Sequence, residues 1–426
     1  MVEKIIYLPR LIEHEISKSM LTNGCVVIEG PKWSGKSTTA ARFSGSIISL
    51  QKPAVYEQYK ILADIGDDNL LNTKKPVLFD EWQKIPELWD YIRAYIDEHS
   101  SKGDFILTGS AKPLKDVNRH SGIGRIKKIT MRTMSLWESN ESSGQVSLQR
   151  LFDGETKISG NNRYTLKDIS FLLCRGGFPN AVLEKHKENA LYYAKDYVKT
   201  LVSSDVVDVD GVRRSEKRAK AILKSYARNI STTANNETIL RDVEPHVDIK
   251  DRKTIPTYLE AYSKLFVIDE TESWTPSLRS KTSIRVSNTR HFVDPCIATA
   301  VLDANPDDLL SDLKTFGLLF ENLVLRDLKI YTQALDGNVY KYRDKSGLEA
   351  DAVIHLDDGR WALIEVKLGG ENLINEGAQN LLKLHDKIDT DKMKTPSFLA
   401  VITASDKFAY QRPDGVCVIP ITCLKP

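Results

Sequence analysis

Residues 30–37 read GPKWSGKS, and this stretch decides the fold of the N-terminal part of the chain. It matches the pattern G-x-x-x-x-G-K-[ST] of a phosphate-binding loop. An apolar run at residues 24–28 leads into it and a helical stretch at residues 36–43 follows, which is the strand–loop–helix context that such a loop requires. The alternative is a glycine-rich turn that binds no ligand.

The spacing of the loop follows from the chemistry of phosphate binding. Gly35 lets the backbone curl so that its N–H groups point at phosphate oxygens. Lys36 would reach the β- and γ-phosphates, the hydroxyl of Ser37 would ligate Mg²⁺, and the following helix adds the positive end of its dipole. The sequence therefore predicts ATP and Mg²⁺ as cofactors. The residues predicted to bind them are Gly30, Pro31, Lys32, Trp33, Ser34, Gly35, Lys36, Ser37 and Thr38.

Two acidic residues close a later buried strand in this part of the chain. Residues 77–79 form an apolar run that ends in Asp80 and Glu81. At the carboxyl edge of a parallel sheet these residues would lie beside the phosphate loop. Asp80 would hold the water shell of the Mg²⁺ ion, and Glu81 would orient and deprotonate the attacking water. The alternative is a solvated strand end.

Apolar runs alternate with helical stretches along the first part of the chain, which predicts a parallel sheet covered on both faces. The remaining runs of this kind are residues 46–50, 105–107 and 126–131, with a helical stretch at residues 87–99. A polar, turn-rich segment at residues 154–162 suggests a boundary, and the pattern is mostly helical from there to about residue 302. We expect three domains, at residues 1–155, 164–300 and 311–426.

Composition narrows the class of protein. The 426 residues hold 60 Lys and Arg against 58 Asp and Glu, so the net charge of +2 does not by itself indicate nucleic acid. No apolar run approaches the ~18 residues that span a bilayer, so we expect no membrane. The five cysteines show no C-x-x-C spacing, which predicts reduced thiols in a cytoplasmic protein without disulfides or a zinc cluster.

Four further segments complete a resemblance to a known family. They are LTGS at residues 107–110, SGIGR at 121–125, MSLWE at 134–138 and GGFP at 176–179. With the phosphate loop, they resemble the AAA ATPases of bacteria and archaea that carry a C-terminal domain of unknown function, over essentially the whole chain. Thr133 departs from the pattern, because a proline often precedes the Met-Ser-Leu segment in that family.

The resemblance implies two more catalytic residues. Ser110 would be the γ-phosphate sensor, and Arg125 would be an arginine finger that reaches a neighbouring subunit, which implies a homo-oligomer. From strand alternation alone, Thr108 and Ser110 share a face, so either could be the sensor. A lone arginine in a glycine-rich turn is otherwise a surface residue.

The middle of the chain carries a basic segment and the order of a winged helix. Two short helices at residues 238–247 and 253–262 and a strand at residues 265–268 give that order, and the resemblance implies such a module. Its second helix would then place Arg252, Lys253, Thr254, Thr257 and Tyr258 near DNA. The alternatives are a solvated helix face or a contact with protein. The basic residues of the preceding segment are Arg213, Arg214, Lys217, Arg218, Lys220, Lys224 and Arg228.

The C-terminal part holds acidic residues in the order of a nuclease. Glu321 lies at the edge of an apolar helix stripe, Asp351 lies on a strand, and Glu365 and Lys367 share one face of the next strand. Asp351 and Glu365 could hold Mg²⁺ for phosphodiester cleavage, with Lys367 positioning water. This resembles the PD-(D/E)xK restriction-endonuclease fold, although Ala350 replaces its proline. Gln379 is a further possible contact, and an inert fold is the alternative.

The predicted fold class is therefore α/β. It combines an AAA-type P-loop core, a winged-helix-like helical middle region and a C-terminal restriction-endonuclease-like α/β domain. Three functions compete: an ATP-driven enzyme that acts on DNA, a nucleotide-controlled interaction switch, and a DNA-binding regulator with an inert nuclease fold.

Overall fold

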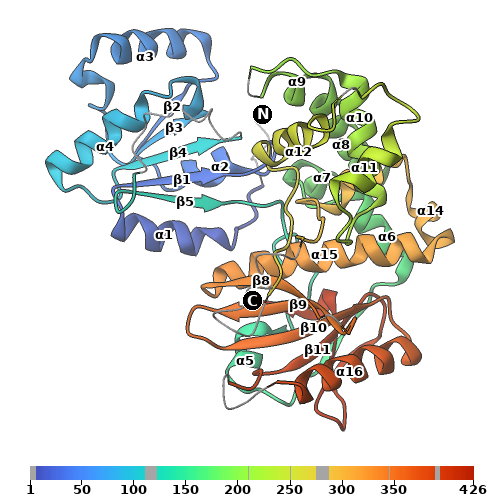
Figure 1. The fold of residues 1–426 in the computed structure, drawn as a ribbon. Helices are drawn as coiled ribbons and strands as arrows, with labels where there is room; N and C mark the ends of the chain where they lie inside the picture. Colours follow the sequence, from blue (N-terminus) through green and yellow to red (C-terminus); the bar gives the residue numbers. More distant parts are fainter. Residues whose placement is uncertain are drawn as a thin grey trace.

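A computed structural model describes residues 6–110, 122–209, 211–249, 251–274, 287–344, 346–388 and 394–426. Ser121, the first residue of the SGIGR segment, lies outside the described residues. Figure 1 shows the N-terminal sheet, the helical region and the C-terminal sheet as three neighbouring bodies, with α15 (Leu313–Ala334) lying between the helical region and the C-terminal sheet.

The N-terminal part is a parallel sheet of five strands in the order β2-β3-β4-β1-β5. This confirms the predicted parallel α/β core. The strands are β1 (Cys25–Glu29), β2 (Ser46–Ser49), β3 (Val77–Asp80), β4 (Phe105–Gly109) and β5 (Ile126–Thr130). The helices are α1 (Ile12–Thr22), α2 (Lys36–Ala41), α3 (Pro53–Ile65) and α4 (Leu88–His99), with short 3₁₀ turns η1 (Asp68–Leu70) and η2 (Trp82–Lys84).

Both faces of this sheet are buried, which explains why its strands are continuous apolar runs. Cys25 and Val27 of β1 pack with residues of α3 and α4, whereas Val26 and Ile28 pack with residues of α1 and α2. Because the strands are parallel, their carboxyl ends lie along one edge, and the phosphate loop begins there at Gly30.

The middle region is helical, as the sequence predicts. Its helices are α6 (Leu166–Arg175), α7 (Pro179–Leu183), α8 (Lys187–Thr200), α9 (Val206–Asp208), α10 (Glu216–Arg228), α11 (Asn236–Val243), α12 (Thr254–Lys264), α13 (Pro295–Val301) and α14 (Pro306–Ser311). A π-helical turn, η3 (Leu201–Asp205), joins α8 to α9. The strand predicted at residues 265–268 is wrong, because only Ile268 of these residues forms a bridge, with Phe292. Isolated bridges follow from Thr271 to Thr289 and from Ser273 to Lys341.

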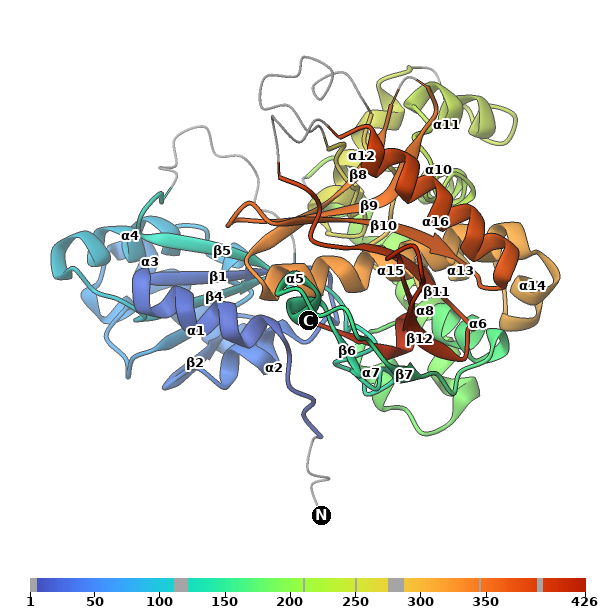
Figure 2. The ribbon, with the colours of Figure 1, turned by 90° about the horizontal axis from the view of Figure 1, so that it is seen from below.

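The C-terminal sheet has seven strands in the order β7-β12-β13-β11-β10-β9-β8. They are β8 (Gly337–Arg343), β9 (Glu349–Leu356), β10 (Trp361–Lys367), β11 (Leu399–Thr403), β12 (Phe408–Gln411), β13 (Cys417–Pro420) and β7 (Gly160–Asn161). Figure 2 shows α15 and α16 (Glu371–Asp386) on opposite faces of this sheet. The 3₁₀ turn η4 (Ile421–Cys423) precedes the last strand.

The segment that follows β5 enters the C-terminal sheet before the chain reaches the helical region. β6 (Val146–Ser147) pairs with β14 (Leu424–Lys425), and the short helix α5 (Leu148–Phe152) follows β6. β7 then pairs with β12, so part of the polar segment at residues 154–162 is a strand. The division into domains at residues 1–155, 164–300 and 311–426 stays a prediction. None of the described helices combines the length and apolarity needed to cross a membrane.

Candidate nucleotide site and C-terminal charge cluster

Two glycines shape the phosphate loop between β1 and α2. Gly30 has φ 157°, and a Cβ there would lie 2.1 Å from the carbonyl oxygen of Met131. Gly35 is left-handed, with φ 93°, and a Cβ there would lie 3.4 Å from Cγ of Pro179. Side chains are disfavoured at both positions. The GGFP turn of the helical region therefore packs directly against the phosphate loop.

The predicted Mg²⁺ ligands face each other. The hydroxyl of Ser37 donates to Oδ1 of Asp80 at 2.5 Å. Thr108, which is fully buried, donates to the same oxygen at 2.7 Å. Hydroxyl and carboxylate oxygens are ligands that suit Mg²⁺, so these residues fit the ion that accompanies ATP.

Glu81 is held beside this pair in a left-handed conformation, with φ 58°. Its Oε2 accepts hydrogen bonds from Ser110, at 3.1 Å, and from Gln83. Ser110 thus faces Glu81, whereas Thr108 faces Asp80. Gln83 was not foreseen from the sequence, because it lies in the 3₁₀ turn after Glu81 and matches no motif.

Lys36 is buried in the loop and donates to the carbonyl oxygen of Pro31 at 2.7 Å. Burial lowers the pKa of its ammonium group to about 8, against the attraction of Glu81 and Asp80. A neutral carbonyl compensates the charge of Lys36 only weakly. Phosphate oxygens would offer this ammonium a charged partner that the loop itself lacks.

The site opens into a cavity of about 850 Å³ between the sheet and the helical region. Asp205, at the end of the π-helical turn, binds Nζ of Lys32 at 2.6 Å. Trp33 packs edge-on against Tyr197, with ring centroids 5.7 Å apart. No local sequence signal marks Asp205. The lining from the phosphate-loop side includes Lys36, Ser37, Thr38, Glu81 and Ser110, and that from the helical region includes Pro179, Asn180, Ser204, Asp205, Val209 and Leu265.

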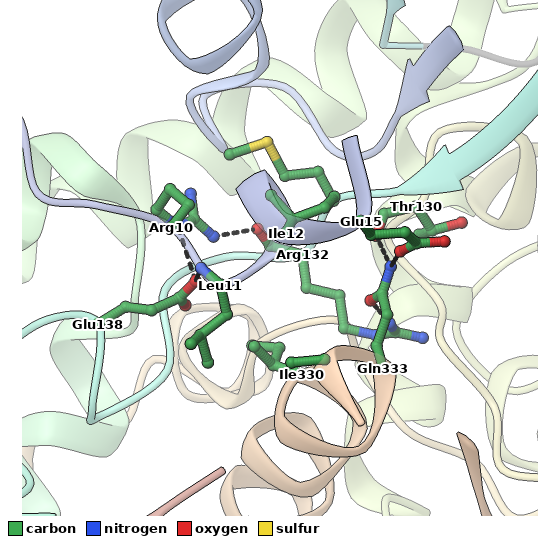
Figure 3. A pocket seen from close by; sticks show the side chains of 11 residues that line it. Arg10, Leu11, Ile12, Glu15, Thr130, Arg132, Glu138, Ile330 and Gln333 are labelled. Atoms are coloured by element: carbon green, nitrogen blue, oxygen red, sulfur yellow. Dashed lines mark hydrogen bonds and ion pairs between the residues drawn. The ribbon is translucent and has the colours of Figure 1, made fainter. Parts of the chain in front are cut away.

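Arg10 holds the phosphate loop through hydrogen bonds to backbone carbonyl groups. The sequence analysis did not predict this role. Its guanidinium donates to the carbonyl oxygen of Ser34 at 2.8 Å and to that of Arg132 at 2.9 Å, and it pairs with Glu138 at 3.1 Å. Figure 3 shows Arg10 and Glu138 on one side of a small cavity and Gln333 of α15 on the other. Arg10 and Glu138 thus tie the phosphate loop to the MSLWE segment.

A buried aspartate gives the GGFP turn and Thr133 a structural role. Oδ2 of Asp294 accepts hydrogen bonds from the Thr133 hydroxyl at 2.7 Å, from the backbone N–H of Gly177 at 2.8 Å and from Arg326 of α15 at 3.0 Å. Thr133, which replaces the proline common in the resembling family, is therefore a hydrogen-bond donor here. Asp294 joins the segment after β5, the helical region and α15 in one network.

Arg125 lies at the end of the sheet opposite the phosphate loop. The N–H of Cys25, the first residue of β1, donates to the Arg125 carbonyl at 3.1 Å, whereas the loop follows the last residue of β1. At ~3.3 Å per residue, that strand separates the two by about 15 Å. The guanidinium pairs with Asp97 of α4 at 2.6 Å, and its side chain is 47% exposed. Arg125 does not line the cavity of its own chain within the described residues.

The basic segment of the helical region divides into exposed and buried residues. Lys217, Lys220 and Lys224 lie exposed along α10, as do Arg252 and Lys253 before α12. Two residues of the expected basic and DNA-contacting sets face inward instead. Arg214 is buried and donates to the carbonyl oxygen of Val206, and Tyr258 is buried and accepts from the N–H of Ser215 at 2.8 Å. The prediction that Tyr258 contacts DNA is therefore wrong.

The C-terminal acids converge, but lysines lie among them. Lys341 of β8 places Nζ 2.9 Å from Oε1 of Glu321 and 3.6 Å from Oδ1 of Asp351. Nζ of Lys367 lies 3.1 Å from Oε2 of Glu365. Gln379 is exposed on α16. Among the residues that the structure describes, no three His, Cys, Asp or Glu side chains are placed to hold a metal ion.

Burial dominates the electrostatics of this cluster. It raises the pKa of Glu321, of Asp351 and of Glu365, the last to about 8. Burial alone would lower the pKa of Lys341, but the attraction of Glu321 and Asp351 outweighs it and raises that pKa. His291, whose Nε2 lies 3.8 Å from Oε1 of Glu321, has a pKa lowered by burial and is neutral. Neither Lys341 nor His291 was foreseen from the sequence.

Comparison with known families assigns the parts of the chain. Residues 22–140 match an AAA domain, residues 166–308 match a domain of unknown function (DUF8612), and residues 316–424 match a second one (DUF4143). The N-terminal part is thus a domain of the AAA ATPase type. The expected AAA ATPase core and C-terminal domain of unknown function are confirmed.

Whole-chain relatives are distant. Uncharacterized protein Rv2008c of Mycobacterium tuberculosis and Uncharacterized protein Mb2031c of Mycobacterium bovis are each 22% identical over 392 residues, which cover 84% of this chain and 78% of theirs. Among solved structures, the Walker-type ATPase PABY2304 of Pyrococcus abyssi is similar with a TM-score of 0.45 at 15% identity, over 70% of this chain and 96% of that one. The Orc1 protein of Aeropyrum pernix in complex with DNA is similar with a TM-score of 0.26 at 10% identity, over 74% and 97% of the two chains.

Proposed function

We propose that this chain hydrolyses ATP and uses the energy to act on DNA, as a homo-oligomer in the cytoplasm. The observation that carries the proposal is the double pairing at the carboxyl edge of the sheet, of Ser37 with Asp80 and of Ser110 with Glu81. Each pair places an acid beside a hydroxyl at the mouth of the phosphate loop. The five cysteines are all free, which supports the cytoplasmic location.

The roles of the residues follow from their positions. Ser37 and Asp80 would hold the Mg²⁺ ion, which neutralises charge on the ATP phosphates when bound. Lys36 would leave the carbonyl of Pro31 and donate to the β- and γ-phosphates. Glu81 would orient the attacking water and take its proton, and Ser110 would keep the Glu81 carboxylate in place and sense the γ-phosphate.

The oligomer is proposed from Arg125. The guanidinium is exposed and lies at the far end of β1 from its own phosphate loop, so it can act only on the site of another subunit. An arginine supplied in trans would stabilise the charge that develops on the transferred phosphoryl group.

The action on DNA is proposed from two features. The lysines of α10 give a basic face at i, i+3 and i+7 spacing, and we propose that the order α10, α11, α12 and bridged segment serves as a winged-helix-like module. The C-terminal order, a helix with Glu321, a hairpin with Asp351 and a strand with Glu365 and Lys367, supports a restriction-endonuclease-like fold.

A nucleotide-controlled interaction switch is the second candidate. It is favoured by the ion pair between Lys32 of the phosphate loop and Asp205 of the helical region, since the phosphates of ATP would compete for Lys32. In that case nucleotide would alter the position of the helical region, and the basic face would bind an acidic protein surface.

The test is ATP turnover by the full chain with and without duplex DNA. We expect Mg²⁺-dependent hydrolysis that DNA stimulates. Glu81→Gln should keep ATP affinity and lose turnover, because it removes the base and keeps the shape, whereas Lys36→Ala should lose binding. A wild-type protein with no ATP affinity by calorimetry would refute the ATPase. A rate of ATP hydrolysis that DNA does not change would favour the interaction switch.

A further inference from the structure

The C-terminal carboxylate cluster fits a metal ion poorly. The restriction-endonuclease-like arrangement implies a Mg²⁺ ion held by Asp351 and Glu365, with Glu321 nearby. Mg²⁺ requires oxygen ligands at about 2.0–2.1 Å in near-octahedral geometry. The space between Glu321 and Asp351, however, holds the Nζ atom of Lys341, at 2.9 and 3.6 Å from their oxygens.

We infer that the ammonium group of Lys341 is the resident cation of this cluster and takes the place of a divalent metal. The C-terminal domain then keeps the nuclease-like arrangement without the metal that phosphodiester cleavage needs. The inference does not depend on ATP hydrolysis, because it concerns a separate site.

The strand geometry holds Lys341 in this position. The pairing of β8 with β9 shifts register between Tyr340 and Tyr342, so that Asp351 and Ala352 of β9 lie opposite Lys341 alone. Such a bulge re-aims side chains at a sheet edge. The Lys341 N–H donates to the carbonyl of Glu272 at 2.8 Å, and its own carbonyl accepts from the N–H of Trp274 at 2.8 Å.

Most carboxylate oxygens of Glu321, Asp351 and Glu365 already face a lysine or a backbone N–H group. Oε1 of Glu321 and Oδ1 of Asp351 face Lys341, Oδ2 of Asp351 accepts from the N–H of Val366 at 2.8 Å, and Oε2 of Glu365 faces Lys367. Oε1 of Glu365 is buried and has no hydrogen-bond partner in the described part of the chain. Mg²⁺ is bound through one or two carboxylates and keeps several waters. The ammonium group of Lys341 occupies the position between Glu321 and Asp351 where such an ion would have to sit.

The inference predicts a gain of metal binding when the lysine charge is removed. Lys341→Gln removes the ammonium group between Glu321 and Asp351 and leaves the neutral His291 beside Glu321 and the more distant charge of Lys367. A divalent ion can then compensate the two carboxylates. The probe is Mn²⁺ alone, titrated without nucleotide into the full chain and followed by the electron paramagnetic resonance signal of free Mn²⁺. Asp80→Asn is present throughout, so that the nucleotide site takes up no metal.

We expect no Mn²⁺ uptake at millimolar concentrations while Lys341 is present. Lys341→Gln should take up one Mn²⁺ per chain with at least tenfold higher affinity, and adding Asp351→Asn should remove it. Lys383→Met, an exposed lysine of the same domain, is the matched control and should gain nothing.

Two results would overturn the inference. The first is that the chain with Lys341 intact binds one Mn²⁺ ion and that Asp351→Asn abolishes this binding. Mn²⁺-dependent plasmid cleavage that Asp351→Asn abolishes would count in the same way. The second is a folded Lys341→Gln protein that takes up no metal. Because Lys341 is buried among acids, its replacement can impair folding. The titration with Lys341 intact then decides the question without that variant.

Discussion

Thr108 and Ser110 lie two residues apart, and their hydroxyls donate hydrogen bonds to different carboxylates. Thr108 is fully buried and bonds Asp80, whereas Ser110 bonds Glu81 at the cavity wall. Strand alternation alone left the choice of sensor open. The geometry favours Ser110 for contact with the reacting groups and Thr108 for holding the metal ligand.

This division predicts different kinetic defects. Ser110→Ala should lower kcat about 10- to 100-fold with little change in KM, because a hydrogen bond to a charged group is worth about 1.5–3 kcal/mol and acts here on the base. Thr108→Val should instead raise the Mg²⁺ concentration that half-saturates turnover. Thr332→Val, a buried threonine whose hydroxyl lacks a partner among the described residues, is the control. Equal effects of both variants on kcat alone would contradict the division.

Lys36 should make ATP affinity depend on pH. Burial lowers its pKa to about 8 in the free protein, and the phosphates stabilise its charged form. Below pH 8 the lysine is already protonated and affinity is flat. As pH rises above 8, binding must take up a proton, so affinity should fall by up to tenfold per pH unit.

The measurement is calorimetry of a non-hydrolysable ATP analogue with the unchanged chain from pH 7 to 9.5, in buffers of different ionisation enthalpy, because Glu81 raises the pKa of Lys36 and must stay in place. Lys75→Met is the control, since burial also lowers the pKa of Lys75 to about 8 but this residue does not line the cavity. Affinity that stays flat to pH 9.5, without proton uptake, would show that Lys36 stays fully charged in the free loop.

At the scale of elements, α10 presents three exposed lysines on one face. If this face binds DNA, replacing Lys217, Lys220 and Lys224 by Ala should lower the slope of log affinity against log salt by about 2–3, since each phosphate contact contributes about 0.9. The same replacements at the exposed Lys314, Lys383 and Lys407 should change it little. The measurement is fluorescence anisotropy with a duplex at several salt concentrations, and equal effects of the two triple variants would argue against α10 as the DNA face.

Elements built from one continuous stretch were predictable. The phosphate loop, Asp80 and Glu81 carry their chemistry in a few adjacent residues, and the buried strands are plain apolar runs. Helix α3 has clear start and stop signals in the sequence, because Pro53 stands at its first position and the left-handed Gly66 follows its end. The sequence prediction nevertheless did not include this helix. The bridges near Ile268 depend on partners some twenty residues away, so the predicted strand there did not form.

Contacts between distant elements were not predictable. The spacing of Asp351, Glu365 and Lys367 predicted that these residues share one site, but Lys341 enters the cluster from β8 through a register shift that no residue pattern marks. Asp205 is a second example, because it reaches Lys32 from a π-helical turn of the helical region that is distant in the sequence. Single-sequence periodicity places side chains on faces and cannot place one element against another.

At the scale of the whole molecule, Arg125 links turnover to assembly. If it acts in trans, turnover per subunit should rise with protein concentration, and Arg125→Ala should bind ATP normally while hydrolysing it about 10³-fold more slowly. Arg93→Ala is the control, because Arg93 also pairs with Asp97 of α4. Specific activity that stays constant on dilution, in a protein shown to be monomeric, would exclude the finger.

The pairing of β7 with β12 has a consequence for synthesis on the ribosome. Asn161 pairs with Phe408, about 250 residues further along the chain. At roughly 5–20 residues per second, β7 would wait about 12–50 s for its partner. The ATPase sheet can close long before, since its last strand ends at Thr130. During this time the nascent chain carries a completed N-terminal sheet followed by an unpaired strand. We expect chaperones to bind the nascent chain at this stage.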